Sequence, residues 1–489
     1  MSAASSSKST ITFSCPVAQE TSNGGENGQN QSGRQKFVPL KIQAEITDLQ
    51  KPTQPILTGI GFLDHMLDQF NSHAQIGVSF LVTNHVDDAD SDLSFEKDHA
   101  HHNRLAEKAH TVIDQKPLFQ RIGTLLGQQF RRILNDKQIP VGVSSFFGCP
   151  LDEALVLVTL ETVSDQGSLA GYNLRPYGSF PSPQGRQYLG HMALAPLEDF
   201  WTAVAEQAGL RVTFLKLRGE NAHHIVEAAF KAFARALRNL IDGIDTILVS
   251  TTTTNGSGLA SLYGPDSANV QASVALERSG TVTRQTKETS IECVLKLDEG
   301  ASGTHVSMGL QGMDRFWTRV SQEARVSLQA TCQGDLWIDE HHTTEDVAIA
   351  LGQVWNQALG TKAGLNRMWC STVVQGTAKV IVVLDLSNRP MLTHNLPLRQ
   401  HKTEHLQNVP VEMLEHVLDS FVVNARMTLH IVVESSSSSQ EEGGSEGIAT
   451  LEDAWDGLAI ALGRALRYGI LVDQRRAGAT ASSKGTLSV

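Results

Sequence analysis

The stretch Asp152–Glu161 (DEALVLVTLE) returns 224 residues later as Gly376–Asp385 (GTAKVIVVLD), in a chain of 489 residues. Two further segments recur in the same order, at offsets of 225 and 229: Leu126-Gly127 with Leu351-Gly352, and Ala236–Arg238 with Ala465–Arg467. Matches in the same order at a nearly constant offset indicate an internal duplication. We predict two copies, residues 37–247 and 268–489, joined by a polar linker at 248–267.

Each copy alternates Val/Leu-rich runs with amphipathic runs. Leu155–Leu160 and Val380–Leu384 are predicted strands, whereas Asn221–Leu240 and Glu345–Leu359 carry apolar residues at helical spacing. The alternation predicts an α+β fold for each copy, in which helices cover one side of the sheets.

The composition excludes several classes of protein. A formal charge of −12 argues against nucleic acid or an anionic membrane as the main partner, and no apolar run is long enough to span a membrane. Five scattered cysteines indicate a reducing compartment. Residues 1–36 and the loop 434–447 have the composition of disordered segments. We expect a cytoplasmic protein, and the composition of the N-terminal segment leaves import into an organelle open.

Two motifs of identical spacing, His223–Glu227 (HHIVE) and His341–Glu345 (HHTTE), each open a predicted helix. Neighbouring helical residues diverge by about 100°, whereas residues three or four apart share a face. Adjacent histidines can therefore face different metal ions, which favours a pair of metals over a single ion. One such motif alone could equally be a solvated helix start. Imidazole ligands favour zinc, whereas carboxylates and six-fold coordination favour manganese, and the spacing does not decide between them.

Longer segments resemble signature motifs of the imidazoleglycerol-phosphate dehydratase family. They are Thr58–Gln69 (TGIGFLDHMLDQ), Pro150–Leu155 (PLDEAL), Asn221–Arg238 (NAHHIVEAAFKAFARALR), Arg284–Ile291 (RQTKETSI), Asp339–Gly352 (DEHHTTEDVAIALG), Asp385–Pro390 (DLSNRP) and Ser482–Gly485 (SSKG). The resemblance implies tandem dehydratase repeats built of ribosomal-protein-S5-domain-2-like half-domains. An ordinary family member is about one copy long and holds every motif once, whereas here the motifs are divided between the copies.

Counting from the shared anchors locates the motif that each copy lacks. The HHTTE positions of the second copy map onto Lys116, Pro117 and Gln120 of the first. The HHIVE positions of the first copy map onto Glu452, Asp453 and Asp456 of the second. His101-His102 has no glutamate four residues later, and we interpret it as part of a surface insertion.

The resemblance implies a centre of two Mn²⁺ ions held by eight protein ligands. They are the histidine of the Asp-His-Met segment, the two His-His-x-x-Glu sets and the histidine of a Thr-Leu-His segment. In this chain these residues are His65, His223, His224, Glu227, His341, His342, Glu345 and His430. Each copy supplies four of them, so we expect one composite site from both copies, formed within a chain or between chains.

The implied reaction is the dehydration of D-erythro-imidazole-glycerol phosphate to imidazole-acetol phosphate in histidine biosynthesis. Glu288 is the expected proton-shuttling carboxylate, and the ligand His65 is also placed among the catalytic residues. The expected contacts to this small phosphate substrate are His73, Lys231, Arg367, Arg389, Ser482, Ser483 and Lys484. Each cation could instead be an ordinary surface residue, Glu288 a surface glutamate at a strand edge, and His73 a capping or core-edge histidine.

Two other functions compete with this reaction as interpretations of the sequence. A catalytically inactive, metal-binding paralogue is the main alternative, and a fused phosphatase is disfavoured because no D-x-D-x-[TV] segment occurs. We also expect a homo-oligomer. The family forms cubic shells of 24 subunits, so a fused pair implies a particle of 12 chains.

Overall fold

The computed structural model describes residues 6–16, 37–47, 56–84, 114–179, 184–243, 278–400, 404–436, 449–473 and 475. The chain divides into two compact units, which are described separately. The first comprises Met1–Ser145, Val158–Lys216 and Glu220–Gly243, and the second comprises Phe146–Leu157, Leu217–Gly219 and Ile244–Val489. The predicted linker, most of the loop 434–447, His101-His102 and Ser482–Lys484 lie outside the described residues.

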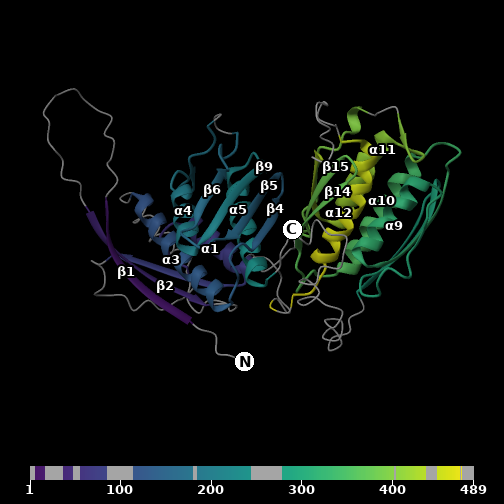
Figure 1. Ribbon diagram of the computed structural model, residues 1–489. Helices are drawn as coiled ribbons and strands as arrows, with labels where there is room; N and C mark the ends of the chain where they lie inside the picture. Colours follow the sequence, from purple (N-terminus) through teal and green to yellow (C-terminus); the bar gives the residue numbers. More distant parts are fainter. Residues whose placement is uncertain are drawn as a thin grey trace, which may run out of the picture. The chain divides into compact units, whose positions relative to one another are not determined.

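The elements up to residue 241 belong to the first copy (Figure 1). They are β1 (Ser6–Pro16), β2 (Phe37–Thr47), α1 (Gly61–Ala74), β3 (Gly77–Asn84), α3 (Gln115–Asp136), β4 (Ser144–Leu151), β5 (Ala154–Thr162), β6 (Ser168–Asn173), β7 (Tyr188–Leu189), β8 (Met192–Ala193), α4 (Leu197–Ala208), β9 (Leu210–Arg218) and α5 (Ala222–Ile241).

The elements from residue 279 onward belong to the second copy. They are β10 (Ser279–Gln285), β11 (Thr289–Lys296), β12 (His305–Ser307), α9 (Gln311–Ala324), β13 (Ser327–Gly334), α10 (His341–Leu359), β14 (Met368–Gln375), β15 (Ala378–Asp385), β16 (Met391–His394), η2 (Leu398–Gln400), β17 (His405–Leu406), β18 (Val409–Pro410), α11 (Val411–Ala425), β19 (Thr428–Ser435) and α12 (Leu451–Gly469). The helices and strands predicted from periodicity are confirmed.

The sheets repeat one topology. In β4-β5-β9-β6, β10-β11-β13-β12 and β14-β15-β19-β16, a sequential pair of strands is followed by a third strand and an edge strand. The edge strand runs parallel to the third strand in each of these sheets. The sheet β1-β2-β3 has the same beginning, and a parallel bridge from Leu57 to Leu81 stands where the other sheets have an edge strand. The predicted α+β architecture of tandem repeats is therefore confirmed.

The prediction that residues 1–36 form one disordered segment is wrong for β1. This strand pairs antiparallel with β2 along its whole length, as β10 pairs with β11. Its Thr-Ile-Thr-Phe run (10–13) has high β-propensity, which the Ser-rich composition of the surrounding segment concealed. The first copy thus begins with β1 rather than at residue 37.

Helices pack in pairs on the sheets, and glycines allow the closest approach. A Cβ atom at Gly127 of α3 would lie 2.6 Å from the carbonyl oxygen of Val204 in α4. A Cβ atom at Gly352 of α10 would lie at the same distance from the carbonyl oxygen of Phe421 in α11. The α3–α4 and α10–α11 pairs are thus equivalent, which confirms the register of the two copies. In the second unit, α12 packs on β14 and β15 (Figure 1). Helix α10 packs on β10 and β11.

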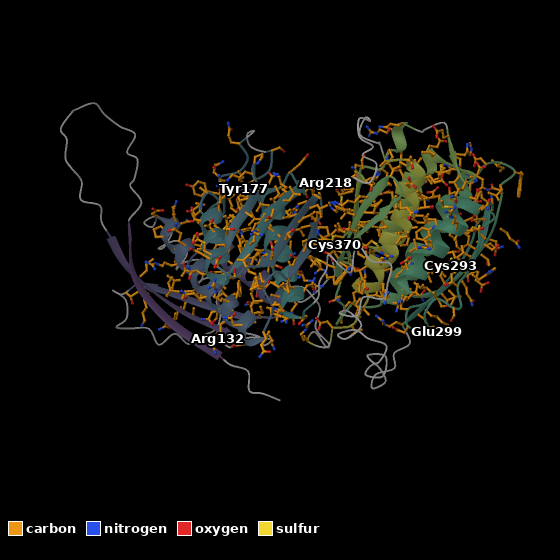
Figure 2. The ribbon with its side chains drawn as sticks, in the orientation of Figure 1. Arg132, Tyr177, Arg218, Cys293, Glu299 and Cys370 are labelled. Carbon is orange, nitrogen blue, oxygen red and sulfur yellow. The ribbon has the colours of Figure 1, made fainter. Side chains whose placement is uncertain are left out.

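Cys149, Cys293, Cys332 and Cys370 are free thiols. Cys293 and Cys370, labelled in Figure 2, are buried, and burial raises the pKa of both thiols to about 12. These thiols are therefore protonated and poorly nucleophilic at neutral pH. In the described part of the chain, no helix is long and apolar enough to cross a membrane.

Candidate metal centre

The first unit brings three ligand-type side chains together between α1 and α5. The Nε2 atoms of His223 and His65 lie 2.9 Å and 3.6 Å from the same oxygen, Oε2 of Glu227. The side chain of Asn221 caps α5 by accepting a hydrogen bond from the backbone N–H of His223. This cap fixes the first turn of α5, from which His223 and Glu227 reach toward α1. The three ligand atoms lie within 4.8 Å of one another, a spacing that can hold a metal ion.

Glu227 is held ionised although it is buried. Burial alone would raise its pKa, but hydrogen bonds from His223 and His65 and the ammonium of Lys231 hold that pKa far below its ordinary value. The Nζ atom of Lys231 lies 2.5 Å from Oε1, while Oε2 faces the two histidines. Lys231 thus orients the carboxylate and leaves one oxygen directed at the cluster.

The second unit contains a group of the same composition between α10 and α11. The Nε2 atom of His341 lies 3.5 Å from Oε2 of Glu345, and the Nε2 atom of His416 lies 3.4 Å from Oε1. The rings of His341 and His416 are 5.5 Å apart. These two groups, one in each unit, are those within the described ranges whose spacing could hold a metal ion.

The remaining histidine of each motif points elsewhere. The rings of His223 and His224 are inclined at 79°, and those of His341 and His342 at 82°. The two rings of each pair therefore point in different directions. Neither His224 nor His342 belongs to the group in its own unit.

His342 is oriented by a carboxylate. Its Nδ1 atom lies 3.0 Å from Oδ2 of the buried Asp335, and this hydrogen bond raises the pKa of His342. The contact directs Nδ1–H to the carboxylate and leaves Nε2 for an external ligand. The exposed Glu288 belongs to the same corner, because its carbonyl oxygen accepts the backbone N–H of Asp335. Its charge also raises the pKa of His342.

His430 does not join the group that contains His341, which differs from the sequence prediction. The side chain is fully buried in β19, and its Nε2–H donates to the carbonyl oxygen of Asp152 at 2.7 Å. Burial lowers the pKa of His430 to about 4, so the imidazole is neutral. His416, rather than His430, lies with His341 and Glu345. The Thr-Leu-His segment does not bring its histidine to this group, because the segment lies on a buried strand rather than on α11.

The predicted substrate contacts differ in how far their side chains are exposed. His73 is buried in α1 with 1% of its surface exposed, which corresponds to the core alternative considered for it. The guanidinium of the buried Arg367 bonds to both oxygens of Asp385, at 2.6 Å and 2.8 Å. Arg389 is about one-third exposed and lies 3.4 Å from Asp152. Of these three, only Arg389 presents a partly open cation.

His416 could not be found by motif spacing, because it is a single histidine on an amphipathic helix. Register counting contains the missing signal. His416 lies nine residues before Ala425, and nine residues before the equivalent Ala208 is Asp199. His416 therefore corresponds in register to a residue that is not histidine. The other candidate ligands show the same pattern.

The family model described as imidazoleglycerol-phosphate dehydratase matches residues 58–237 and 308–448. The chain is 36% identical to the imidazoleglycerol-phosphate dehydratase of Nitrobacter hamburgensis over 210 residues, which cover 43% of this chain and 98% of that protein. It is 34% identical to the chloroplastic imidazoleglycerol-phosphate dehydratase 1 of Arabidopsis thaliana over 222 residues, 45% of this chain and 76% of the relative. The crystal structure of the Staphylococcus aureus enzyme aligns with 22% identity and a TM-score of 0.32, covering 40% of this chain and 99% of that one.

Proposed function

The chain belongs to the imidazoleglycerol-phosphate dehydratase family, and on this premise we propose that it dehydrates D-erythro-imidazole-glycerol phosphate to imidazole-acetol phosphate. The family is one of hydro-lyases, and the proposed reaction is a step of histidine biosynthesis. The observation that carries the proposal is the pair of three-residue groups, each with two imidazole nitrogens and a carboxylate oxygen in ligand spacing.

The donor sets fit two Mn²⁺ ions. His65, His223 and Glu227 would hold one ion, and the group of His341, Glu345 and His416 would hold the other. His224 and His342 are the motif histidines that belong to neither group, and the ring of each is steeply inclined to that of its neighbour. We propose that each completes the coordination of the ion held by the other unit, within a chain or between chains. The composite site is thus retained, with His416 in place of His430.

When bound, the two ions act as Lewis acids and orient the substrate. The protein residues have distinct tasks. Lys231 and Asp335 orient Glu227 and His342, respectively, by direct contacts. Glu288 is an exposed carboxylate beside His342 and would carry the proton removed from the substrate carbon.

The substrate phosphate requires cations outside the two metal groups. Arg389 is the described candidate with a partly open guanidinium, and Ser482–Lys484 remain predicted contacts. A phosphate bound to Arg389 would compete with the carboxylate of Asp152, whose contacts at 3.4 Å are long for a charged pair.

The test is metal analysis combined with an assay of imidazole-acetol phosphate formation by the full chain. His224→Ala and His342→Ala are each expected to abolish Mn²⁺-dependent dehydration, whereas His405→Ala, at an exposed site on β17, should not affect it. Mixing the two inactive variants should partly restore activity if the site forms between chains. Substantial activity in either variant alone would mean that each unit has its own site.

The same assay addresses the alternative of an inactive paralogue. Wild-type protein that contains two Mn²⁺ ions per chain but forms no product would favour a structural or regulatory role. Wild-type protein that forms product only after Mn²⁺ is restored would exclude that role as the sole function.

A further inference from the structure

Each unit contains one helix pair that holds a candidate metal group, α1–α5 in the first unit and α10–α11 in the second. Each also contains a pair equivalent to the one that holds the group of the other unit, α3–α4 in the first and α9–α12 in the second. We call the ligand-bearing end of such a helix pair a corner, and a corner that lacks these ligands a vacated corner. In α1 and α9, the first-turn residues Asp64 and Asp314 accept the backbone N–H of Thr58 and Met308, at 2.8 Å and 2.7 Å. The next residue in each helix is therefore equivalent: His65 in the first unit and Arg315 in the second.

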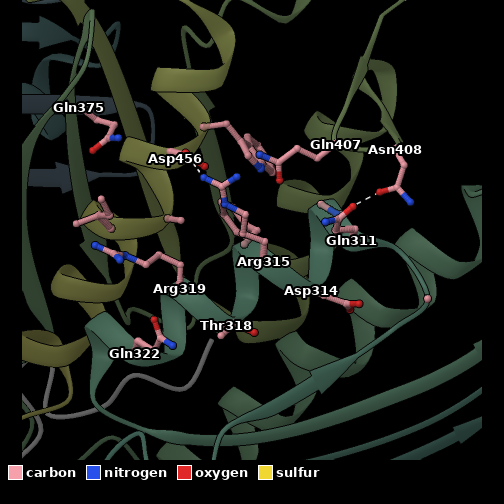
Figure 3. A pocket seen from close by; sticks show the side chains of 16 residues that line it. Gln311, Asp314, Arg315, Thr318, Arg319, Gln322, Gln375, Gln407, Asn408 and Asp456 are labelled. Carbon is pink, nitrogen blue, oxygen red and sulfur yellow. Dashed lines mark hydrogen bonds and ion pairs between the residues drawn. The ribbon is translucent and has the colours of Figure 1, made fainter.

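The partner helices are equivalent as well. Glu227 of α5 lies eleven residues before Arg238, and Asp456 of α12 lies eleven residues before Arg467. Where the first unit places His65 against Glu227, the second places Arg315 against Asp456, with Nη2 2.7 Å from Oδ2. Figure 3 shows Arg315 reaching from α9 toward Asp456 on the wall of a cavity of about 740 Å³.

The other vacated corner, in the first unit, has the same replacement. Lys116 and Gln120 of α3 correspond to His341 and Glu345, and Asp199 of α4 corresponds to His416. The Nζ atom of Lys116 lies 3.0 Å from Oδ1 of Asp199, and Nε2 of Gln120 donates to the same oxygen at 3.3 Å. An ammonium and an amide thus surround one carboxylate oxygen where the second unit has a group of metal-ligand type.

We infer that a side-chain cation stands in for the metal at both vacated corners, Arg315 with Asp456 and Lys116 with Asp199. Each pair joins two helices that a metal would otherwise bridge, and its fixed positive charge repels a divalent ion. Each unit therefore has one metal-dependent corner and one corner that is closed without metal. This inference deepens the proposed function, because it limits each chain to the two ions of the composite site.

The experiment uses a full-length chain in which both metal groups are disabled by Glu227→Gln and Glu345→Gln. Equilibrium dialysis against Mn²⁺ followed by elemental analysis should find a loss of both ions. The vacated corner of the second unit is then rebuilt in the pattern of the first by adding Arg315→His, Glu452→His and Asp456→Glu. The rebuilt chain should recover about one Mn²⁺ per chain. Far-UV circular dichroism confirms that each variant is folded.

A matched control carries Arg325→His in place of the change at Arg315, which puts the new imidazole at the other end of α9, and it should recover no ion. A disabled chain that still binds Mn²⁺, and loses it on Asp456→Asn or Asp199→Asn, would overturn the inference. So would a folded rebuilt chain without metal. These readouts do not require activity, so a wild-type chain that binds two ions without dehydration would refute only the proposed function.

A second measurement tests the structural part in the otherwise unchanged protein. Arg315→Met should lower the thermal unfolding midpoint by the same amount with chelator and with Mn²⁺. His65→Ala should instead reduce the rise in midpoint that Mn²⁺ produces. A loss of the Mn²⁺-induced rise in the Arg315→Met variant would show that this corner takes part in metal binding, contrary to the inference.

Discussion

The burial of His430 has a measurable consequence for stability. Its pKa of about 4 in the folded chain lies below the ordinary value of 6.5, so folding favours the neutral imidazole. The unfolded chain therefore binds the proton more readily, and His430 destabilises the fold as the pH falls from about 6.5 toward 4. From these two pKa values, protonation between pH 7.5 and pH 5.0 costs about 2 kcal/mol. At neutral pH the contribution is close to zero.

The assay is urea unfolding followed by tryptophan fluorescence in chelator. Five of the six tryptophans lie in the second unit, so Trp201→Phe makes the signal report on that unit alone. His430→Gln keeps a donor for the Asp152 carbonyl but cannot be protonated. The fall in the free energy of unfolding between the two pH values should then be smaller by about 2 kcal/mol than in the parent.

His416→Gln provides the matched comparison. It should lower Mn²⁺ binding, because His416 lies at a half-exposed ligand position. His430→Gln should instead reduce the pH dependence of the free energy of unfolding and leave the metal content unchanged. An unaltered pH dependence in His430→Gln, or a loss of bound Mn²⁺ in that variant, would refute the assignment of His430 as a buried neutral histidine outside the metal group.

Three further variants test contacts around the centre. Lys231→Met should weaken Mn²⁺ binding by about 10- to 100-fold, measured by competition with a chelating dye, because its carboxylate partner loses a fixed orientation. Asp335→Asn should weaken binding by a similar factor and lower the pKa of His342 toward its ordinary value, as followed by NMR titration without metal; an unchanged pKa would contradict the contact. Arg367→Met should destabilise the second unit by about 3–5 kcal/mol in urea unfolding, because it leaves Asp385 buried without its partner; Lys379→Met, at an exposed ion pair, should cost less than about 1 kcal/mol.

The repeat and its elements could be predicted from the sequence because they rest on local patterns. Helix α5 follows from its apolar spacing, and the register of the copies follows in part from the Leu-Gly pairs whose glycines admit a neighbouring helix. Strand β1 was missed because its partner β2 lies beyond a polar segment, and pairing rather than composition decides its structure. The role of His416 depends on how α10 packs on α11, and no spacing within one helix encodes that contact.

In the proposed composite site, the ion pairs at the vacated corners would make the loss of metal ligands difficult to reverse. A carboxylate between two packed helices needs a positive charge, and a metal ion, a lysine or an arginine can supply it. Replacing the histidine at one corner by arginine removes a ligand and also places a charge that repels any incoming cation. The change stabilises the metal-free corner in the same step, so a later return to histidine would first leave Asp456 without its partner. Once each unit has made this exchange at the opposite corner, each retains one group of metal-ligand type, which is the arrangement that the proposed composite site uses.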